Sequence, residues 1–183
     1  NFGRAADMSR KALAINPKNA NAHLFLGDCL RYMNKFEEAE KEYSAYLSLS
    51  DFDPNPLWKF AGYMVLPTFT TRNASTKMVY RDRKNQAYFG LCVCEQKLKN
   101  FNVAIQYCRQ ALRYDPKDPF SYYHLGWINL DKYNIDLRRE YLIAAKSNFE
   151  KVIDLNPDLE EANDARHYLE DIQTRIKAAP QSR

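Results

Sequence analysis

Apolar and small residues recur along the chain at fixed spacings that predict helices. One pattern has a bulky apolar residue, an alanine three positions later, a second packing residue after seven more, and a closing Pro or Asp after a further five. It occurs four times, as Phe2, Ala5, Ala12, Pro17; Phe36, Ala39, Tyr46, Asp51; Phe101, Ala104, Ala111, Pro116; and Leu142, Ala145, Val152, Pro157. Because proline cannot donate the backbone bond that a continuing helix needs, the closing prolines indicate helix ends.

A second pattern, with spacings of three, one and three, predicts a partner helix before each of the last three segments. Its members are His23, Leu26, Gly27, Leu30; Tyr88, Leu91, Cys92, Glu95; and Tyr122, Leu125, Gly126, Asn129. The third member is small each time. We expect the two helices of a pair to cross closely there, with the alanine of the partner helix facing it.

Together these patterns resemble the tetratricopeptide repeat family, whose 34-residue unit is a helix-turn-helix with a small residue at the crossing and a terminal proline. The resemblance implies an all-α fold, a right-handed superhelical solenoid of antiparallel helix pairs. It also implies a protein that binds other proteins, because each repeat buries its apolar face against its neighbours and the array presents a concave surface.

The register divides residues 1–183 into one array. We expect the second helix of a truncated repeat at 1–17, a repeat at 20–51, a degenerate repeat at 54–84, a repeat at 85–116, a repeat with a seven-residue extension at 119–157, and a capping helix at 159–178. Since Phe2 already occupies a second-helix position, Ala5 and Ala12 would be left uncovered. We therefore expect the natural protein to continue upstream with at least one more helix.

The degenerate repeat departs most from the pattern. Asn55-Pro56 predicts a helix start, and Leu57 to Met64 follow the first-helix spacing, but the second helix is missing. In its place we expect a basic loop that contains Arg72, Lys77, Arg81, Arg83 and Lys84. This loop either determines partner specificity or is a solvated connector.

The other departures are simpler. Seven extra residues are about two helical turns, so both helices of the last repeat are expected to be longer, with Asp136 capping the second. The capping helix has one apolar face and one charged face, which suits the end of an array. The apolar face consists of Leu159, Ala162, Ala165, Leu169, Ile172 and Ile176.

Composition and charge add few constraints. The net charge is +4, and basic and acidic residues are interspersed, so we expect no nucleic-acid partner. No segment approaches the roughly 18 apolar residues of a membrane span. The chain has 183 residues, of which 45% are hydrophobic, enough for a continuous core.

The reactive side chains of the sequence, its cysteines and histidines, are not spaced as catalytic or metal sites require. The four cysteines, Cys29, Cys92, Cys94 and Cys108, fall at packing positions and are expected to be free, buried side chains, which weakly favours a reducing, cytoplasmic location. The three histidines lie in different repeats. We therefore predict no metal site, no cofactor and no enzymatic activity.

The resemblance implies a groove lined by the first helix of each repeat. Its residues would be Leu24, Phe25, Asp28, Arg31, Tyr32, Trp58, Phe89, Val93, Gln96, Lys97, Tyr123, His124 and Trp127. This lining is aromatic and sparsely charged, which favours a peptide or helix with apolar anchors. The alternative is that Phe89, Tyr123 and Trp127 pack against neighbouring helices.

Repeat domains of this family that bind the acidic C-terminus of heat-shock chaperones carry lysine, arginine and asparagine at set groove positions. Here those positions hold Leu24, Asp28, Phe120 and His124, so such a partner is disfavoured. The leading hypothesis is a non-catalytic interaction module or scaffold. The alternatives are a regulatory or substrate-recruiting arm of a larger enzyme, and a module for self-association.

Overall fold

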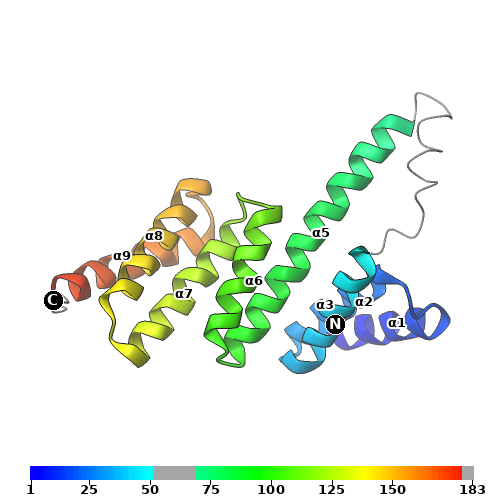
Figure 1. The fold of residues 1–183 in the computed structure, drawn as a ribbon, viewed down its shortest axis with the longest axis horizontal. Coiled ribbons are helices and arrows are strands. Elements are labelled where there is room, and N and C mark those ends of the chain that lie inside the picture. Colours follow the sequence, from blue (N-terminus) through cyan, green and yellow to red (C-terminus); the bar gives the residue numbers. More distant parts are fainter. Residues whose placement is uncertain (52–68, 179–183) are drawn as a thin grey trace. The chain divides into compact units, whose positions relative to one another are not determined.

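The computed structural model describes residues 1–51 and 69–178, with side chains for all of these except 51 and 69–82. These residues form helices joined by short turns (Figure 1). The helices are α1 (Phe2–Ile15), α2 (Ala20–Tyr32), α3 (Phe36–Asp51), α5 (Phe69–Lys97), α6 (Phe101–Tyr114), α7 (Pro119–Asp136), α8 (Arg139–Leu155) and α9 (Glu160–Ala178). The all-α, helical-repeat fold class is thus confirmed. The chain forms two compact units, Asn1–Cys94 and Glu95–Arg183, which are described separately.

Helix ends follow the local signals in the sequence. The helices α1, α6 and α8 end at Ile15, Tyr114 and Leu155, each two residues before a proline of the repeat pattern. Asp118 begins α7 as its N-cap and accepts hydrogen bonds from the backbone N–H groups of Phe120 and Ser121. A capping carboxylate of this kind satisfies backbone donors that have no partner within the helix.

The core of the first unit centres on Tyr43 of α3, which is fully buried. A Cβ added to Gly27 of α2 would lie 2.9 Å from the Tyr43 ring, and one added to Gly90 of α5 would clash with it as well. The tyrosine therefore fills the space that two glycines leave open. Gly27 lies at the predicted helix crossing, and Gly90 makes a second close approach.

In the second unit, Gly126 of α7 has the equivalent role. A Cβ there would lie 2.6 Å from the ring of Phe149 in α8. The apolar face of α9 completes this core, because Ala162, Ala165 and Ile172 are buried and the other three predicted residues pack against the same cluster. At this end of the chain, α9 packs against both α8 and α7.

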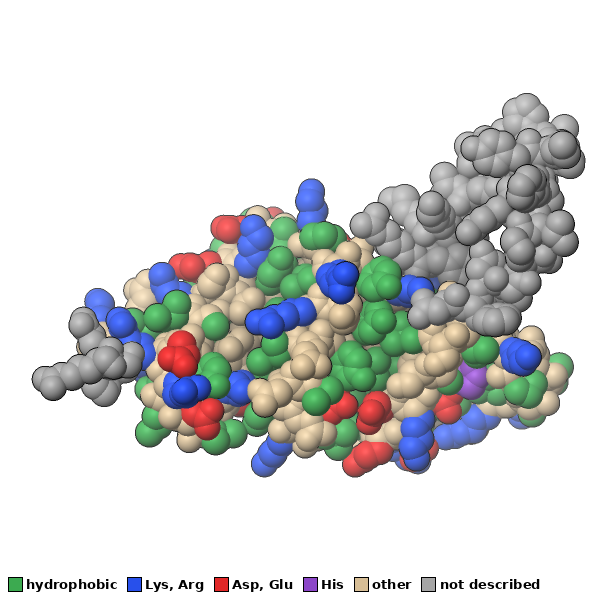
Figure 2. Space-filling model, viewed as in Figure 1, with side chains coloured by type: hydrophobic (Ala, Val, Ile, Leu, Met, Phe, Trp, Pro, Cys, Tyr) green, Lys and Arg blue, Asp and Glu red, His purple; other side chains and the backbone are tan. Residues whose placement is uncertain are grey.

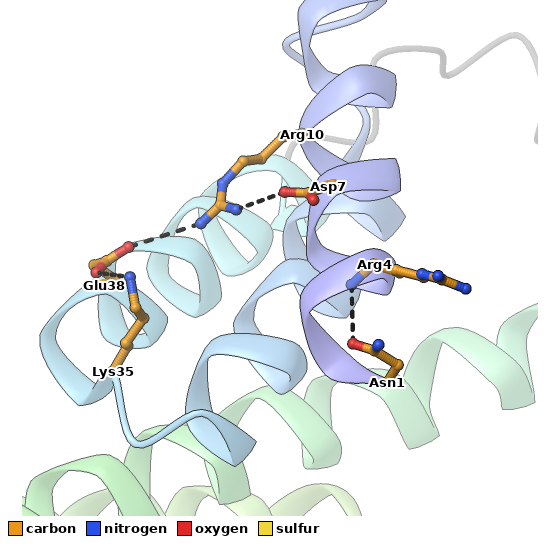
Figure 3. A network of polar contacts seen from close by, with 6 residues as sticks. All are labelled: Asn1, Arg4, Asp7, Arg10, Lys35 and Glu38. Carbon is orange, nitrogen blue, oxygen red and sulfur yellow. Dashed lines mark hydrogen bonds and ion pairs between the residues drawn. The ribbon is translucent and has the colours of Figure 1, made fainter.

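The α1 helix is the least covered. Ala5 is exposed, whereas the alanines at the same register position, Ala39, Ala104 and Ala145, are completely buried. Arg10 of α1 contacts Asp7 at 3.2 Å and Glu38 of α3 at 3.9 Å, and Glu38 also pairs with Lys35 (Figure 3). Since these charged groups are all well exposed, the network contributes little to stability.

The predicted basic loop is wrong as a conformation. Residues 69–84 are helical and continue without interruption into the rest of α5, a helix of 29 residues. The physical reason lies in the sequence, which has neither proline nor glycine between Pro67 and Gly90. The first helix of the degenerate repeat, with Trp58, falls outside the described residues.

The seven-residue extension is accommodated in helix length. The helices α7 and α8 have 18 and 17 residues, against 13 in α2 and 14 in α6. Asp136 is the last residue of α7 and not the cap of α8, so that expectation is wrong. The chain reverses instead at Leu137, whose φ of 53° is left-handed, and Arg138 takes the N-cap position of α8.

The cysteines differ from the expectation. Cys29 and Cys94 are buried and outside any disulfide, but Cys92 and Cys108 are disulfide-bonded. A packing position in the sequence predicts that a cysteine is buried, but it does not determine whether its sulfur is a thiol or part of a disulfide. Two of the four cysteines on which the prediction of a reducing compartment was based are therefore not thiols.

Candidate functional site

The most developed surface of the first unit lies where α2 faces the described part of α5. On α2, Asn21, Phe25, Asp28 and Tyr32 lie at i, i+4, i+7 and i+11 and form one stripe. On α5, successive turns contribute Arg83, Gln86 and Phe89. We call these seven residues, together with Arg31, the α2–α5 face.

A polar network occupies the centre of the face. The Tyr43 hydroxyl donates to Asp28 Oδ1 at 2.7 Å, and Gln86 Nε2 donates to Asp28 Oδ2 at 2.5 Å. Arg31 Nε donates to the Tyr43 hydroxyl at 3.2 Å. The network joins α2, α3 and α5, so it fixes the positions of side chains on the face.

Burial dominates the electrostatics of this network. Removal from water raises the pKa of Asp28, although hydrogen bonds from Tyr43 and Gln86 and the charge of Arg31 oppose this. The pKa of the Tyr43 hydroxyl is also raised, first by burial and then by the nearby Asp28 charge. The tyrosine therefore remains a neutral hydrogen-bond donor at physiological pH.

Aromatic rings and guanidinium groups alternate along the face. The Arg31 guanidinium lies 4.3 Å from the Tyr32 ring centroid and 5.9 Å from that of Phe89. The Arg83 guanidinium lies 6.0 Å from the Phe25 centroid and donates to Asn21 Oδ1. These distances suit cation–π attraction, which orients the side chains without removing their charge.

The large side chains at the ends of the face are open to solvent. Phe25 is 51% exposed and Tyr32 is 56% exposed. Phe2 of α1, itself 49% exposed, stacks on Tyr32 with a centroid distance of 4.6 Å. Exposed aromatic residues held by their neighbours in this way lose little conformational freedom when a partner covers them.

Two residues predicted to line a groove belong to the core instead. Leu24 is 1% exposed and Val93 is 5% exposed. Leu24 is next to the exposed Phe25 in sequence, and Val93 follows Phe89 by four residues on α5. Neither side chain is available to a partner at the surface.

In the second unit, α7 places its predicted residues against the capping helix. The Trp127 ring lies 4.5 Å from that of Tyr168, and the Tyr123 hydroxyl donates to Asp164 Oδ2 at 3.0 Å; Tyr168 and Asp164 belong to α9. Burial is the main cause that raises the pKa of Tyr123 to about 12. This arrangement agrees with the packing alternative for Tyr123 and Trp127.

The remaining predicted residues do not gather at one place. His124 Nδ1 lies 2.7 Å from Gln96 Oε1, and Lys97 is exposed at the end of α5. Of the five basic residues predicted for the loop, Arg83 and Lys84 are half-buried on α5. The other three, Arg72, Lys77 and Arg81, lie on its helical backbone where side chains are not described.

Several residues of the site were missed in the sequence analysis. Gln86 and Asn21 lie two positions before the bulky residues Tyr88 and His23, and the predicted lining began only after those residues. Tyr43 lies between the register positions Ala39 and Tyr46. One signal could have identified it, since Phe149 falls at the same offset in the last repeat and fills the same space against a glycine.

A separate depression of about 400 Å³ lies in the second unit between the start of α6 and the end of α7. It is lined by Lys99, Asn100, Phe101, Asn102, Val103, Lys132, Ile135 and Asp136. None of these is a predicted site residue.

Within the described residues, no cluster of three or more His, Cys, Asp or Glu side chains could hold a metal ion. None of the described helices combines the length and apolar character needed to cross a membrane. Lys and Arg side chains alternate with Asp and Glu on the face drawn in Figure 2. The α2–α5 face is the candidate site because it combines exposed aromatic rings with an ordered polar network.

Comparisons with known proteins agree with the repeat architecture. Two tetratricopeptide repeat models match residues 1–58 and 86–118. A crystal structure of MamA shares 16% identity with a TM-score of 0.60, over 97% of this chain and 86% of that one. The first TPR of Spaghetti (RPAP3), bound to the HSP90 peptide SRMEEVD, shares 19% identity with a TM-score of 0.54, over 86% of this chain and 93% of that one. No curated protein sequence matches the chain.

Proposed function

The chain is a tetratricopeptide repeat protein, and from this premise we propose that it is a non-catalytic interaction module that binds a peptide or protein segment on the α2–α5 face. The observation that carries this proposal is the pair of exposed aromatic side chains, Phe25 and Tyr32, on either side of an ordered polar network. Aromatic and arginine side chains dominate the energetics of protein interfaces.

The magnitudes favour binding at this surface. Full burial of one large apolar side chain is worth about 1.5–3 kcal/mol, so two half-exposed aromatic rings supply a few kcal/mol when a partner covers them. The network holds Asp28 and Arg31 in place before a partner arrives. Binding therefore costs little in side-chain ordering.

The polar side chains of the network form hydrogen bonds with one another, which supports a non-catalytic role. Both Asp28 carboxylate oxygens accept hydrogen bonds from the protein, and the Tyr43 hydroxyl both donates and accepts. A general base or nucleophile needs a lone pair or proton available to a substrate. These hydrogen bonds give Asp28 and Tyr43 a structural role in the surface.

The chaperone C-terminus remains a disfavoured partner. The RPAP3 domain is bound to an HSP90 peptide, but the clamp of chaperone-binding domains has lysine and asparagine at the first-helix positions that here hold Leu24 and Asp28. Leu24 is buried, and Asp28 is a carboxylate. Neither residue supplies the cation or the amide group with which the clamp binds a terminal carboxylate.

The test compares serine substitutions of exposed apolar residues, two on the α2–α5 face and one away from it. Partners captured from a lysate by the wild-type protein are identified, and their affinities are then measured by calorimetry for wild type, Phe25→Ser, Tyr32→Ser and Met8→Ser. Met8 is 72% exposed on α1 and serves as the matched control. Each variant on the face should lose about tenfold or more in affinity, while Met8→Ser binds like wild type. Equal affinities for all four proteins would refute the proposal.

A further inference from the structure

The α2–α5 face carries more positive charge than its own carboxylate balances. Arg31 and Arg83 contribute two guanidinium groups, against the single carboxylate of Asp28. Within the described part of the chain, no Asp or Glu oxygen lies within ion-pair distance of either guanidinium. Three other described arginines, Arg10, Arg138 and Arg175, do have such partners.

Asp28 directs its hydrogen bonds into the protein and forms no ion pair with either arginine, although the Arg31 charge still acts on its carboxylate. Its two oxygens accept from Tyr43 and Gln86, and it touches Arg31 only through the Tyr43 hydroxyl. Arg31 and Arg83 are held instead by the rings of Tyr32 and Phe25. Each cation thus lies beside an exposed aromatic ring.

From this geometry we infer that the α2–α5 face selects an internal acidic segment of a partner protein, in which Asp or Glu side chains flank a large apolar residue. The apolar residue packs on Phe25 or Tyr32, and the neighbouring carboxylates pair with Arg83 and Arg31. Guanidinium groups suit this role because they form two parallel hydrogen bonds to a carboxylate and remain stacked on an aromatic ring. The inference rests on the proposed function and adds the chemistry of the partner.

An internal segment is sufficient, because the pairing uses side-chain carboxylates next to an apolar residue and requires no free chain end. This separates it from the terminal carboxylate clamp. Pairing at a partly desolvated interface is worth more than at an open surface, and it makes the affinity fall as salt rises.

The experiment uses a random library of C-terminally amidated 12-residue peptides, selected on the whole chain. Individual binders are then measured by fluorescence anisotropy against wild type, Phe25→Ser, Arg83→Gln, Arg31→Gln and Arg10→Gln. Arg10→Gln removes the same charge from an arginine that is already paired. Because Arg31 also supports Tyr43, Arg83→Gln is the decisive variant should Arg31→Gln unfold.

The inference predicts binders that are rich in Asp and Glu, need Phe25, and weaken about fivefold or more in Arg83→Gln but not in Arg10→Gln. Binders that need Phe25 but are neutral or basic, and are indifferent to Arg83, would overturn the inference and leave the proposed function intact. If no binder depends on Phe25, both fail.

Discussion

At the scale of one residue, the raised pKa of Asp28 makes the stability of the protein depend on pH. Its pKa is raised because burial outweighs the hydrogen bonds and the Arg31 charge that favour ionisation. The folded protein therefore holds the Asp28 proton more tightly than the unfolded chain, whose reference pKa is 3.8. The stability contributed by this group is fully present below that value and is lost as the pH rises through the folded pKa.

The Asp28→Asn variant lacks this ionisation. We expect the free energy of unfolding of wild type minus that of Asp28→Asn to fall as pH rises above about 4 and then to level off. Urea unfolding at a series of pH values measures this difference. A difference that rises with pH over the same interval would show that the hydrogen bonds outweigh burial.

Gly126 sets the helix spacing in the second unit, and its replacement tests how tightly α7 and α8 pack. A Cβ would lie 2.6–2.9 Å from three ring atoms of the fully buried Phe149. Alanine gains up to about 1 kcal/mol in helix propensity, but overpacking costs about 1–3 kcal/mol, so Gly126→Ala should destabilise the protein.

Gly3→Ala is the control for this substitution. Gly3 is also helical, but the nearest atom to an added Cβ is Asn1 Oδ1 at 3.5 Å. This variant should be neutral or stabilising by up to about 1 kcal/mol in chemical denaturation. If both variants changed stability equally, the close contact with Phe149 would not be the cause.

At the scale of elements, α9 determines what α7 can present. The Trp127 ring packs on Tyr168 and belongs to the cluster that α7, α8 and α9 share. We expect Trp127→Ala to lower the free energy of unfolding by about 2–4 kcal/mol. Peptide binding to the α2–α5 face should be unaffected at a temperature where the variant is folded.

Ile143→Ala provides the comparison for Trp127→Ala. Ile143 lies on α8 in the same unit but is 50% exposed. Its truncation should change stability by no more than about 0.5 kcal/mol. If Trp127→Ala were as stable as Ile143→Ala but bound peptide less tightly, Trp127 would be a binding residue and not a core residue.

Most helices could be predicted from the sequence because their signals are local. Pro17, Pro116 and Pro157 indicate helix ends, and the small residues Gly27 and Gly126 indicate crossings. The helix over residues 69–84 could not be obtained from the repeat pattern, because the residues that mark a second helix are missing there. Its local sequence, without proline or glycine, carried the better information.

The site was harder to predict than the helices. Spacing identifies a face of α2, but it cannot say which neighbour covers Leu24 or leaves Phe25 open. The Asp28 network depends on Tyr43 and Gln86, which lie 15 and 58 residues away along the chain. Such distant pairing follows from packing and not from local pattern.

At the scale of the whole molecule, burial is unevenly distributed among the helices. In α1 only Ala6 is buried, and Met8 and Ile15 are 72% and 87% exposed. In α8 four residues are buried, all with no exposed surface. In a repeat array, where each helix is stabilised by its immediate neighbours, this difference predicts unequal local stability.

Amide hydrogen exchange of the intact chain measures that difference. We expect α1 amides to exchange at least about tenfold faster than α8 amides, after correction for intrinsic rates, because α1 opens without exposing much apolar surface. Residues 143–152 of α8 should be among the slowest of the second unit. Similar protection in the two helices would mean that the chain opens as one cooperative unit, and local burial would then not govern its stability.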